Sequence, residues 1–270
     1  MPALRVVLGD QLSNEISSLN SIDAENDIVL ICEVFAEATY VKHHKKKIAF
    51  LFSAMRHFCE ELRDEKKYQV EYFKLNDSEP MNSFTQAVEK TMAKHKIDEI
   101  IVTSPGEYRV LTEINGWQEF FGLPVDIRDD DRFLCNQFEF REWSKDRKNL
   151  RMEYFYREMR KKYSILMDGD QPVGGKWNFD IENRKSPNSN FDVPETFSSE
   201  PDKVTLDVMK LVEDKFSDHM GVLSGFHFAI NATQAKLALR QFIDERLKYF
   251  GDFQDAMIQG LSLIHISEPT

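Results

Sequence analysis

Polar residues stand where the first two apolar runs of the sequence end, and carboxylates and amides at such positions can hydrogen-bond a ligand. A glycine there lets a ligand or another segment approach the backbone closely. An equally weighted alternative is local: the glycine makes a turn, and the aspartate after it caps a helix. After the run at 4–8 come Gly9, Asp10 and Gln11, and the run at 27–34 is closed by Glu33 and Glu37.

A histidine and lysine cluster lies at 43–47, at the start of a predicted helix. Positive charge there opposes the helix dipole, at a cost of about 0.3–1 kcal/mol per exposed residue. The cluster indicates placement for an anion or a polar ring, although a solvated lysine face with one histidine turned inward is the stronger alternative. His43 and His44 lack a carboxylate at metal-ligand spacing, so support for zinc is weak.

Two later segments also combine charge with aromatic rings. The first, at 145–162, has eight lysines and arginines against three acidic residues, with three aromatic residues at 154–156. It could grip phosphates and stack bases, or form an amphipathic helix with its aromatics in a core. The second, "QPVGGKWNFDIENR" at 171–184, offers two glycines, two large aromatics and several polar side chains. It fits a binding loop and an interdomain clasp equally well.

The elements that must position these residues alternate between two periods. Apolar residues at 48–62 recur on one helical face, with similar stripes at 84–92 and, more loosely, 111–121. Strands alternating with helices predict a parallel sheet, and therefore a Rossmann-like α/β domain whose ligand lies at the carboxyl ends of the strands. We expect later helices at 145–163, 202–216 and 232–257, the last capped by Asn231 and Gln234. The predicted strands are 4–8, 27–34, 69–75, 98–103 and 124–127.

Composition and missing motifs narrow the function classes. The 270 residues are 41% hydrophobic and 30% charged, and the net charge of −11 disfavours a general nucleic-acid coat. Neither a Gly-x-Gly-x-x-Gly fingerprint nor a P-loop is present, which argues against dinucleotide dehydrogenases and P-loop enzymes. Three scattered cysteines do not form a disulfide framework or a cysteine-rich metal site. With no secretory signal and no long apolar stretch, a cytoplasmic protein away from membranes is expected.

Several motifs together resemble one family. They are "VLGDQLS", "CEVFAEATYVKHHKKKIAFLFSAMRHF", "DDRFL", "MEYFYREMRKK", "QPVGGKWNFD.ENR" and "FIDERLKYFGDFQDAM", in this order between residue 4 and about 259. The chain is similar to the bacterial photolyase-related proteins, the iron-sulfur branch of the cryptochrome and photolyase family. This resemblance implies a flavoprotein that repairs (6-4) photoproducts in DNA with blue light, a lyase. A blue-light photoreceptor without repair activity, or a stand-alone small-molecule-binding domain, remains an alternative.

The resemblance also implies cofactors and site residues. The α/β domain would hold an antenna chromophore, 6,7-dimethyl-8-ribityllumazine, which passes excitation to FAD. Tyr249 matches a flavin-contacting position, and Asp180 and Asp255 would face DNA with a Mg²⁺ between carboxylate and phosphate. The residues expected around the antenna are Gly9, Asp10, Gln11, Glu33, Glu37, Tyr40, His43 and Lys46. Those expected on the side of the DNA, which carries ultraviolet photoproducts, are Arg157, Arg160, Lys176, Asn178 and Arg184.

The expected division of the chain follows the resemblance. Family members are about twice as long, so the match predicts a monomeric chain truncated after the start of its FAD domain and without repair activity of its own. Most FAD contacts, the catalytic residues and the iron-sulfur cysteines would lie beyond residue 260. The expected parts are an α/β antenna domain at 1–132, a linker with a basic helix at 133–201, the start of an incomplete all-α FAD-binding domain at 202–260, and a non-native tail at 261–270.

Overall fold

The computed structural model describes residues 1–187 and 191–254. They form two compact units, each made of two separate stretches of chain. Unit 1 contains residues 1–130 and 197–238, and unit 2 contains the described parts of 131–196 and 239–254. In both ranges together, no helix is both long enough and apolar enough to cross a membrane.

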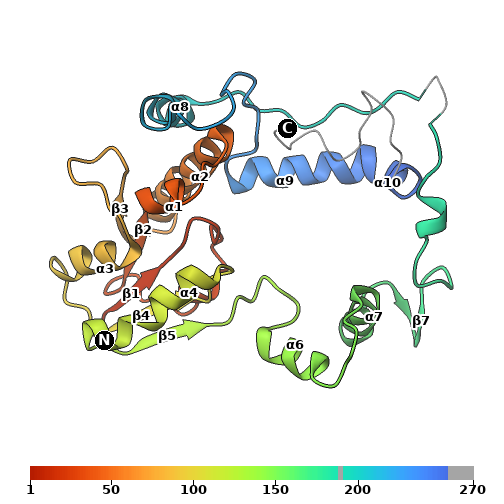
Figure 1. Ribbon diagram of the computed structural model, residues 1–270, viewed down its shortest axis with the longest axis horizontal. Helices are drawn as coiled ribbons and strands as arrows, with labels where there is room; N and C mark the ends of the chain where they lie inside the picture. Colours follow the sequence, from red (N-terminus) through yellow and green to blue (C-terminus); the bar gives the residue numbers. More distant parts are fainter. Residues whose placement is uncertain (188–190, 255–270) are drawn as a thin grey trace. The chain divides into compact units, whose positions relative to one another are not determined.

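Unit 1 is built on a parallel sheet with the strand order β3-β2-β1-β4-β5 (Figure 1). This confirms the Rossmann-like α/β fold expected from the alternation of strands and helices. All neighbouring strands run parallel, so every carboxyl end lies at the same edge. The strands are β1 (Ala3–Val6), β2 (Ile28–Cys32), β3 (Gln69–Phe73), β4 (Glu99–Thr103) and β5 (Val125–Arg128).

Alternating side chains of the central strands feed two separate cores. Leu4 and Val6 point to the core shared with α3 and α4, whereas Val29 and Ile31 point to the core shared with α2. The predicted helix at 111–121 is two helices, because Gly116 is both the C-cap of the first and the N-cap of the second. The helices of this region are α1 (Phe35–Thr39), α2 (Lys45–Asp64), α3 (Phe84–Met92), α4 (Tyr108–Asn115) and α5 (Trp117–Phe121), with a 3₁₀ turn η1 (Ser17–Leu19).

The later stretch of unit 1 covers the outer face of α2. Helix α8 (Lys203–Lys215) is capped by Asp202, whose side chain accepts from the Thr205 backbone N–H at 2.9 Å. Val208 and Val212 of α8 are fully buried in the same core as Phe52 of α2. Residues 197–238 therefore complete the core of unit 1, although more than sixty residues of chain separate them from its first stretch, 1–130.

Unit 2 contains helices, a short hairpin and irregular chain. The predicted basic helix begins only at Met152, since Arg151 is in an extended conformation, and a separate helix precedes it that the sequence analysis did not predict. The helix predicted at 232–257 starts in unit 1, where Asn231 accepts from the Gln234 N–H, and the helical chain continues through Phe253. Residues 255–257 of this prediction lie outside the described residues. The elements of unit 2 are α6 (Gln137–Ser144), α7 (Met152–Tyr163), β6 (Met167–Asp168), β7 (Gln171–Pro172), η2 (Asp180–Glu182), the π-helical η3 (Phe242–Arg246) and α10 (Leu247–Phe253). Helix α9 (Ala232–Gln241) begins in unit 1 and ends in unit 2.

Candidate functional site

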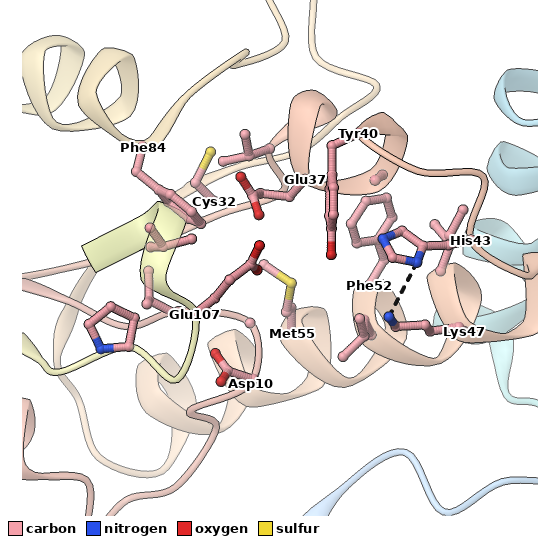
Figure 2. Close-up of a pocket in the computed structure, with 18 of the residues that line it drawn as sticks. Asp10, Cys32, Glu37, Tyr40, His43, Lys47, Phe52, Met55, Phe84 and Glu107 are labelled. Carbon is pink, nitrogen blue, oxygen red and sulfur yellow. Dashed lines mark hydrogen bonds between the residues drawn. The ribbon is translucent and has the colours of Figure 1, made fainter. Parts of the chain in front are cut away.

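Strand order reverses between β1 and β4, which are neighbours in the sheet but not in the chain. The segments leaving their carboxyl ends turn to opposite faces, and such a switch point opens a crevice in α/β sheets. A cavity of about 330 Å³ lies there in unit 1. It is bordered by residues that follow β1, β2 and β4, together with one face of α2 (Figure 2).

The cavity combines an apolar wall with polar groups at its edge. Its wall includes Ile48, Phe52 and Met55 of α2, which belong to the predicted helical stripe, and Phe84 of α3. A mostly apolar hollow with a few convergent polar groups is typical of a site for a small organic ligand. The polar side chains that line it are Asp10, Glu37, Tyr40, His43, Lys47 and Glu107 (Figure 2).

Gly9 follows β1 and lies against Met55 of α2. A Cβ atom at this position would stand 3.1 Å from the Met55 sulfur, closer than ordinary van der Waals contact. The absence of a side chain therefore lets the strand tip sit beside the cavity wall. No helix begins after Asp10, because the next helical turn, η1, starts at Ser17 with Ile16 before it. The alternative in which Asp10 caps a following helix is wrong.

Glu37 is held across the cavity mouth by Arg109. The guanidinium donates to both carboxylate oxygens, at 2.7 and 2.6 Å, and also lies 3.0 Å from Glu107. Its central carbon is 4.6 Å from the centre of the Tyr40 ring. Donation of these hydrogen bonds to Glu37 raises the pKa of Arg109 above its ordinary value. Arg109 of α4 thus contacts both Glu37 and Tyr40, which follow β2.

His43 and Lys47 form the polar end of the cavity. The Lys47 ammonium lies 3.2 Å from His43 Nδ1, and the Tyr40 ring packs edge-on against the imidazole. Burial, and then the charge of Lys47, lowers the pKa of His43. The expected lysine, Lys46, does not line the cavity, although its backbone N–H donates to His44 Nδ1 at 3.0 Å.

Residues 219–221, which follow α8, pack against the segment that carries His43 and Lys47. His219 Nδ1 lies 2.9 Å from the backbone oxygen of His43, and the Lys45 N–H donates to the Met220 carbonyl at 3.0 Å. Gly221 has φ of +83°, and a Cβ there would overlap the His44 ring at 1.8 Å. Only glycine fits at this position, and its lack of a side chain lets the His44 ring, at the start of α2, pack directly against the backbone of this stretch.

Gln11 and Glu33, both expected at the ligand, have fully buried side chains that do not line the cavity. The Gln11 amide donates to the carbonyls of Thr103 and Ser104 and so joins the ends of β1 and β4. Glu33 accepts from Arg56 Nε at 2.6 Å, and also from Nη2, from Tyr72 Oη and from the Leu75 N–H. With their hydrogen-bonding capacity used within the protein, they build the edge of the sheet beneath the cavity.

The cysteines do not fit an iron-sulfur cluster, which needs several thiolates around one site. Cys32 lines the cavity, Cys59 lies on α2 and Cys135 lies in unit 2. Burial raises the pKa of both Cys32 and Cys59, which favours the neutral thiol. No group of three histidine, cysteine or acidic residues able to hold a metal ion occurs among residues 1–187 and 191–254.

In unit 2, four of the residues expected on the DNA side gather around Trp177. Arg157 and Arg160 lie over its ring, at 5.3 and 5.4 Å from the centroid. Asn178 donates to Glu153 at 3.0 Å, and Lys176 lies 5.8 Å from the Phe179 ring. The fifth, Arg184, is exposed beyond η2.

The two remaining expectations concern flavin and metal. Tyr249 of α10 packs edge-on against Phe191, with ring centroids 5.0 Å apart, and Lys248 lies over its ring. Asp180 starts η2 and lines a pocket of unit 2. Asp255 lies outside the described residues, so the expected pairing of the two aspartates stays a prediction.

Lys47 belongs to the predicted cluster at 43–47, although Lys46 was the lysine expected at the ligand. Sequence analysis missed Glu107, which lines the cavity, and Arg109, which pairs with Glu37 beside it. Both missed residues lie in "SPGEYRV" at 104–110, directly after the fourth predicted strand. In a Rossmann-like order this strand neighbours the first, so the polar residues after it were candidates on the same physical grounds as Asp10.

Comparison with known proteins gives a consistent result. The family model for deoxyribodipyrimidine photo-lyase-related proteins matches residues 5–228. A (6-4) photolyase from Agrobacterium fabrum is 50% identical over 259 residues, which cover 96% of this chain and 51% of that protein. The chain therefore spans about half the length of that relative. An uncharacterized protein, R852, from Acanthamoeba polyphaga mimivirus is 25% identical over 200 residues, 71% of this chain and 98% of its own length.

Proposed function

Because this chain belongs to the deoxyribodipyrimidine photolyase-related family, we propose that it is the antenna-binding and DNA-facing portion of a light-dependent DNA repair flavoprotein of the (6-4) photolyase type. The observation that carries the proposal is the cavity at the strand-order reversal of unit 1. It lies within the segment matched by the family model, and its volume falls in the range of small-ligand sites.

The proposed ligand of this cavity is 6,7-dimethyl-8-ribityllumazine. Its flat ring suits the wall formed by Phe52, Met55 and Phe84, and its carbonyl, ring-nitrogen and hydroxyl groups suit the polar edge. Asp10 and Glu37 are acceptors for ribityl hydroxyls, whereas Lys47 is a donor to a ring carbonyl. Arg109 holds Glu37 with both oxygens engaged, so Glu37 offers its remaining lone pairs in a fixed direction.

The proposed DNA-facing surface is the cationic group around Trp177 in unit 2. Arg157, Arg160 and Lys176 offer charge to phosphates, and Arg184 extends the group beyond η2. Contacts of this kind fix the position of a protein on DNA without reading its sequence. The DNA substrate, like the repair activity, comes to this chain by its relation to the Agrobacterium protein.

FAD, when bound, would supply the light-driven electron transfer, because such redox chemistry belongs to the cofactor. Within the described residues only Tyr249 is proposed to contact it, and the Tyr249 ring is positioned by its packing against Phe191. The iron-sulfur cluster is not assigned to Cys32, Cys59 or Cys135, which lie apart from one another in two units. What this chain itself contributes is the cavity, its polar edge and the cationic surface.

Titration of the purified 270-residue chain with 6,7-dimethyl-8-ribityllumazine, followed by ligand fluorescence, tests the proposal. We expect saturable one-to-one binding with a shifted emission spectrum. Ala38, a buried residue of α1, lines the cavity, so Ala38→Phe should fill the space and abolish binding. Ala36→Phe is the matched control, because Ala36 is exposed on the same helix and does not line the cavity.

Equal binding by the two phenylalanine variants would place the ligand elsewhere and overturn the assignment of the cavity. Circular dichroism of both variants shows whether Ala38→Phe keeps its fold. If it does not, Lys47→Ala supplies a second test, since Lys47 is exposed and its truncation should weaken binding without unfolding the chain.

A further inference from the structure

Unit 2 contains a second pocket, of about 350 Å³, between α7 and the loop after the β6–β7 hairpin. Gly174 has φ of +82°, a conformation that favours glycine. The Phe179 ring lies close to it: a Cβ atom added to Gly174 would stand 3.3 Å from Phe179 Cζ. The loop thereby brings Trp177, Asn178 and Phe179 to face Tyr156 and Arg160 of α7 around one hollow.

Aromatic faces form much of this pocket. Tyr156 and Phe179 are each 48% exposed, and Trp177 is half-buried. Exposed aromatic rings around a hollow offer stacking area for a planar heterocycle, and base-on-ring stacking tolerates any nucleobase. The aromatic lining of the pocket therefore suits a flat ring.

Arg160 gives the pocket a fixed positive charge. It is only 6% exposed, and its guanidinium donates to the backbone carbonyls of Ile165 and Leu166. Among the residues that the structure describes, no carboxylate lies within ion-pair distance of it. A buried cation that has only neutral partners favours an anionic ligand beside it. Lys161, 5.5 Å from the Trp177 ring centroid, adds to the same field.

Polar edge groups complete the pocket. Asn178 donates through its amide nitrogen to Glu153, so its amide oxygen is left to accept from a ligand. Asp180 contributes a carboxylate from the start of η2. An amide oxygen and a carboxylate are acceptors that suit the amino and imino groups of a nucleobase edge.

We propose that this pocket holds one unpaired nucleobase of a DNA strand, stacked on Tyr156 and Phe179, with the adjoining phosphate beside Arg160. The inference rests on the proposed function in taking DNA as the partner. It adds that unit 2 binds a base displaced from the duplex as well as the phosphate backbone. Taking a base out of its stack costs a few kcal/mol, and aromatic stacking with charge neutralisation can offset this cost.

The test compares two single strands of equal length and charge on the complete 270-residue chain. One is a fluorescein-labelled 12-nucleotide DNA of mixed sequence, and the other is the same backbone with abasic sugars throughout. Fluorescence anisotropy should show about tenfold tighter binding of the strand that carries bases. Phe179→Ala and Tyr156→Ala should each remove most of this preference and leave binding of the abasic strand unchanged.

Phe138→Ala is the matched control, because Phe138 is an exposed aromatic residue of unit 2, on α6, that does not line the pocket. It should keep the full preference. Arg160→Gln should weaken binding of both strands to the same degree. A free nucleoside monophosphate should compete only at concentrations far above those of the labelled strand.

Equal affinity for the two strands would overturn this inference and leave the proposed DNA surface standing. Competition by the mononucleotide at the concentration of the strand would also overturn it, because the site would then recognise a free nucleotide. Failure of both strands to bind would instead contradict the DNA-facing role on which the inference depends. Retention of the preference in Phe179→Ala and Tyr156→Ala would place the base outside this pocket.

Discussion

Two regions at the end of strand β2 each contain a glutamate paired with an arginine, in opposite environments. Glu33 and Arg56 lie beneath the cavity, with side chains 0% and 9% exposed, whereas Glu37 and Arg109 lie at its mouth, with side chains 25% and 42% exposed. Both arginines donate twice to their carboxylate. The same pair of residue types therefore builds the fold in one place and shapes a binding site in the other, and solvent access makes the difference.

The hydrogen-bonding partners show the same contrast. Glu33 also accepts from Tyr72 and Leu75, and burial together with the Glu33 charge raises the pKa of Tyr72 well above its ordinary value. Although burial opposes the charged form of Arg56, hydrogen bonding to Glu33 raises the pKa of that guanidinium. The mouth pair has instead Tyr40 and Glu107 beside it, on segments that also touch the cavity.

The largest expected effect is on Glu33. Glu33→Ala leaves the buried Arg56 charge without its partner, so the free energy of unfolding should fall by about 3–5 kcal/mol. Urea unfolding followed by circular dichroism measures this change. Glu37→Ala, at the mouth, should cost less than about 1 kcal/mol, because its ion pair is exposed to solvent. Similar losses for the two variants would remove the contrast between the regions.

Next in size is the effect of Arg109 on ligand binding. Arg109→Gln frees both Glu37 and Tyr40, so affinity for 6,7-dimethyl-8-ribityllumazine should fall about tenfold, equivalent to about 1.4 kcal/mol. Stability should change by less than about 1 kcal/mol. Arg109→Lys keeps the charge but lacks the two-pronged geometry, so we expect an intermediate affinity. An unchanged dissociation constant in Arg109→Gln would show that the mouth pair has no part in binding.

A smaller effect separates two neighbouring lysines. Lys47 lines the cavity and Lys46 does not, so Lys47→Ala should weaken ligand binding about threefold to fivefold, the worth of roughly one net hydrogen bond. Lys46→Ala, which removes the same charge from the same helical turn, should leave the affinity within error. Isothermal titration calorimetry measures both. A loss shared equally by the two variants would indicate a long-range charge effect instead of a contact.

The smallest expected effect is on the titration of His43. Its folded-state pKa is lowered below the ordinary value of 6.5, by burial and then by Lys47. The stability that its neutral form contributes is therefore fully present above pH 6.5 and is lost as pH falls through the lowered pKa. NMR titration of the imidazole protons should show this pKa below 6.5, and Lys47→Ala should raise it. A pKa above 6.5 in the wild-type chain would contradict the geometry of this end of the cavity.

Much of the sheet could be predicted because its strands are short apolar runs separated by helical stripes. The spacing of Ile48, Phe52, Met55 and Cys59 likewise predicts the buried face of α2, and all four are buried. Helix ends were harder, since the basic segment at 145–163 has helical periodicity but begins its helix only at Met152. Local backbone conformation at Arg151, which the pattern does not encode, decided that boundary.

The site was only partly predictable, because residues at a strand end point either into the protein or toward the cavity. Asp10 and Gln11 are adjacent, yet Asp10 lines the cavity while Gln11 bridges β1 and β4. The partner that decides the role of Glu37, Arg109, is 72 positions away in the chain. Sequence spacing shows which residues reach the strand ends, whereas direction and pairing depend on contacts between distant segments.

The insertion of His44 beside Gly221 has a consequence for dissecting the protein. Unit 1 cannot be excised by cutting the chain after residue 130, because residues 197–238 belong to the same compact unit and cover the apolar outer face of α2. A fragment ending at that point would leave Phe52 and Phe58 without Val208, Val212 and Phe216 and would tend to self-associate. Unit 1 is built from two stretches that are separated in the sequence. A minimal protein that contains only unit 1 must therefore join residues 1–130 to residues 197–238 through a new linker.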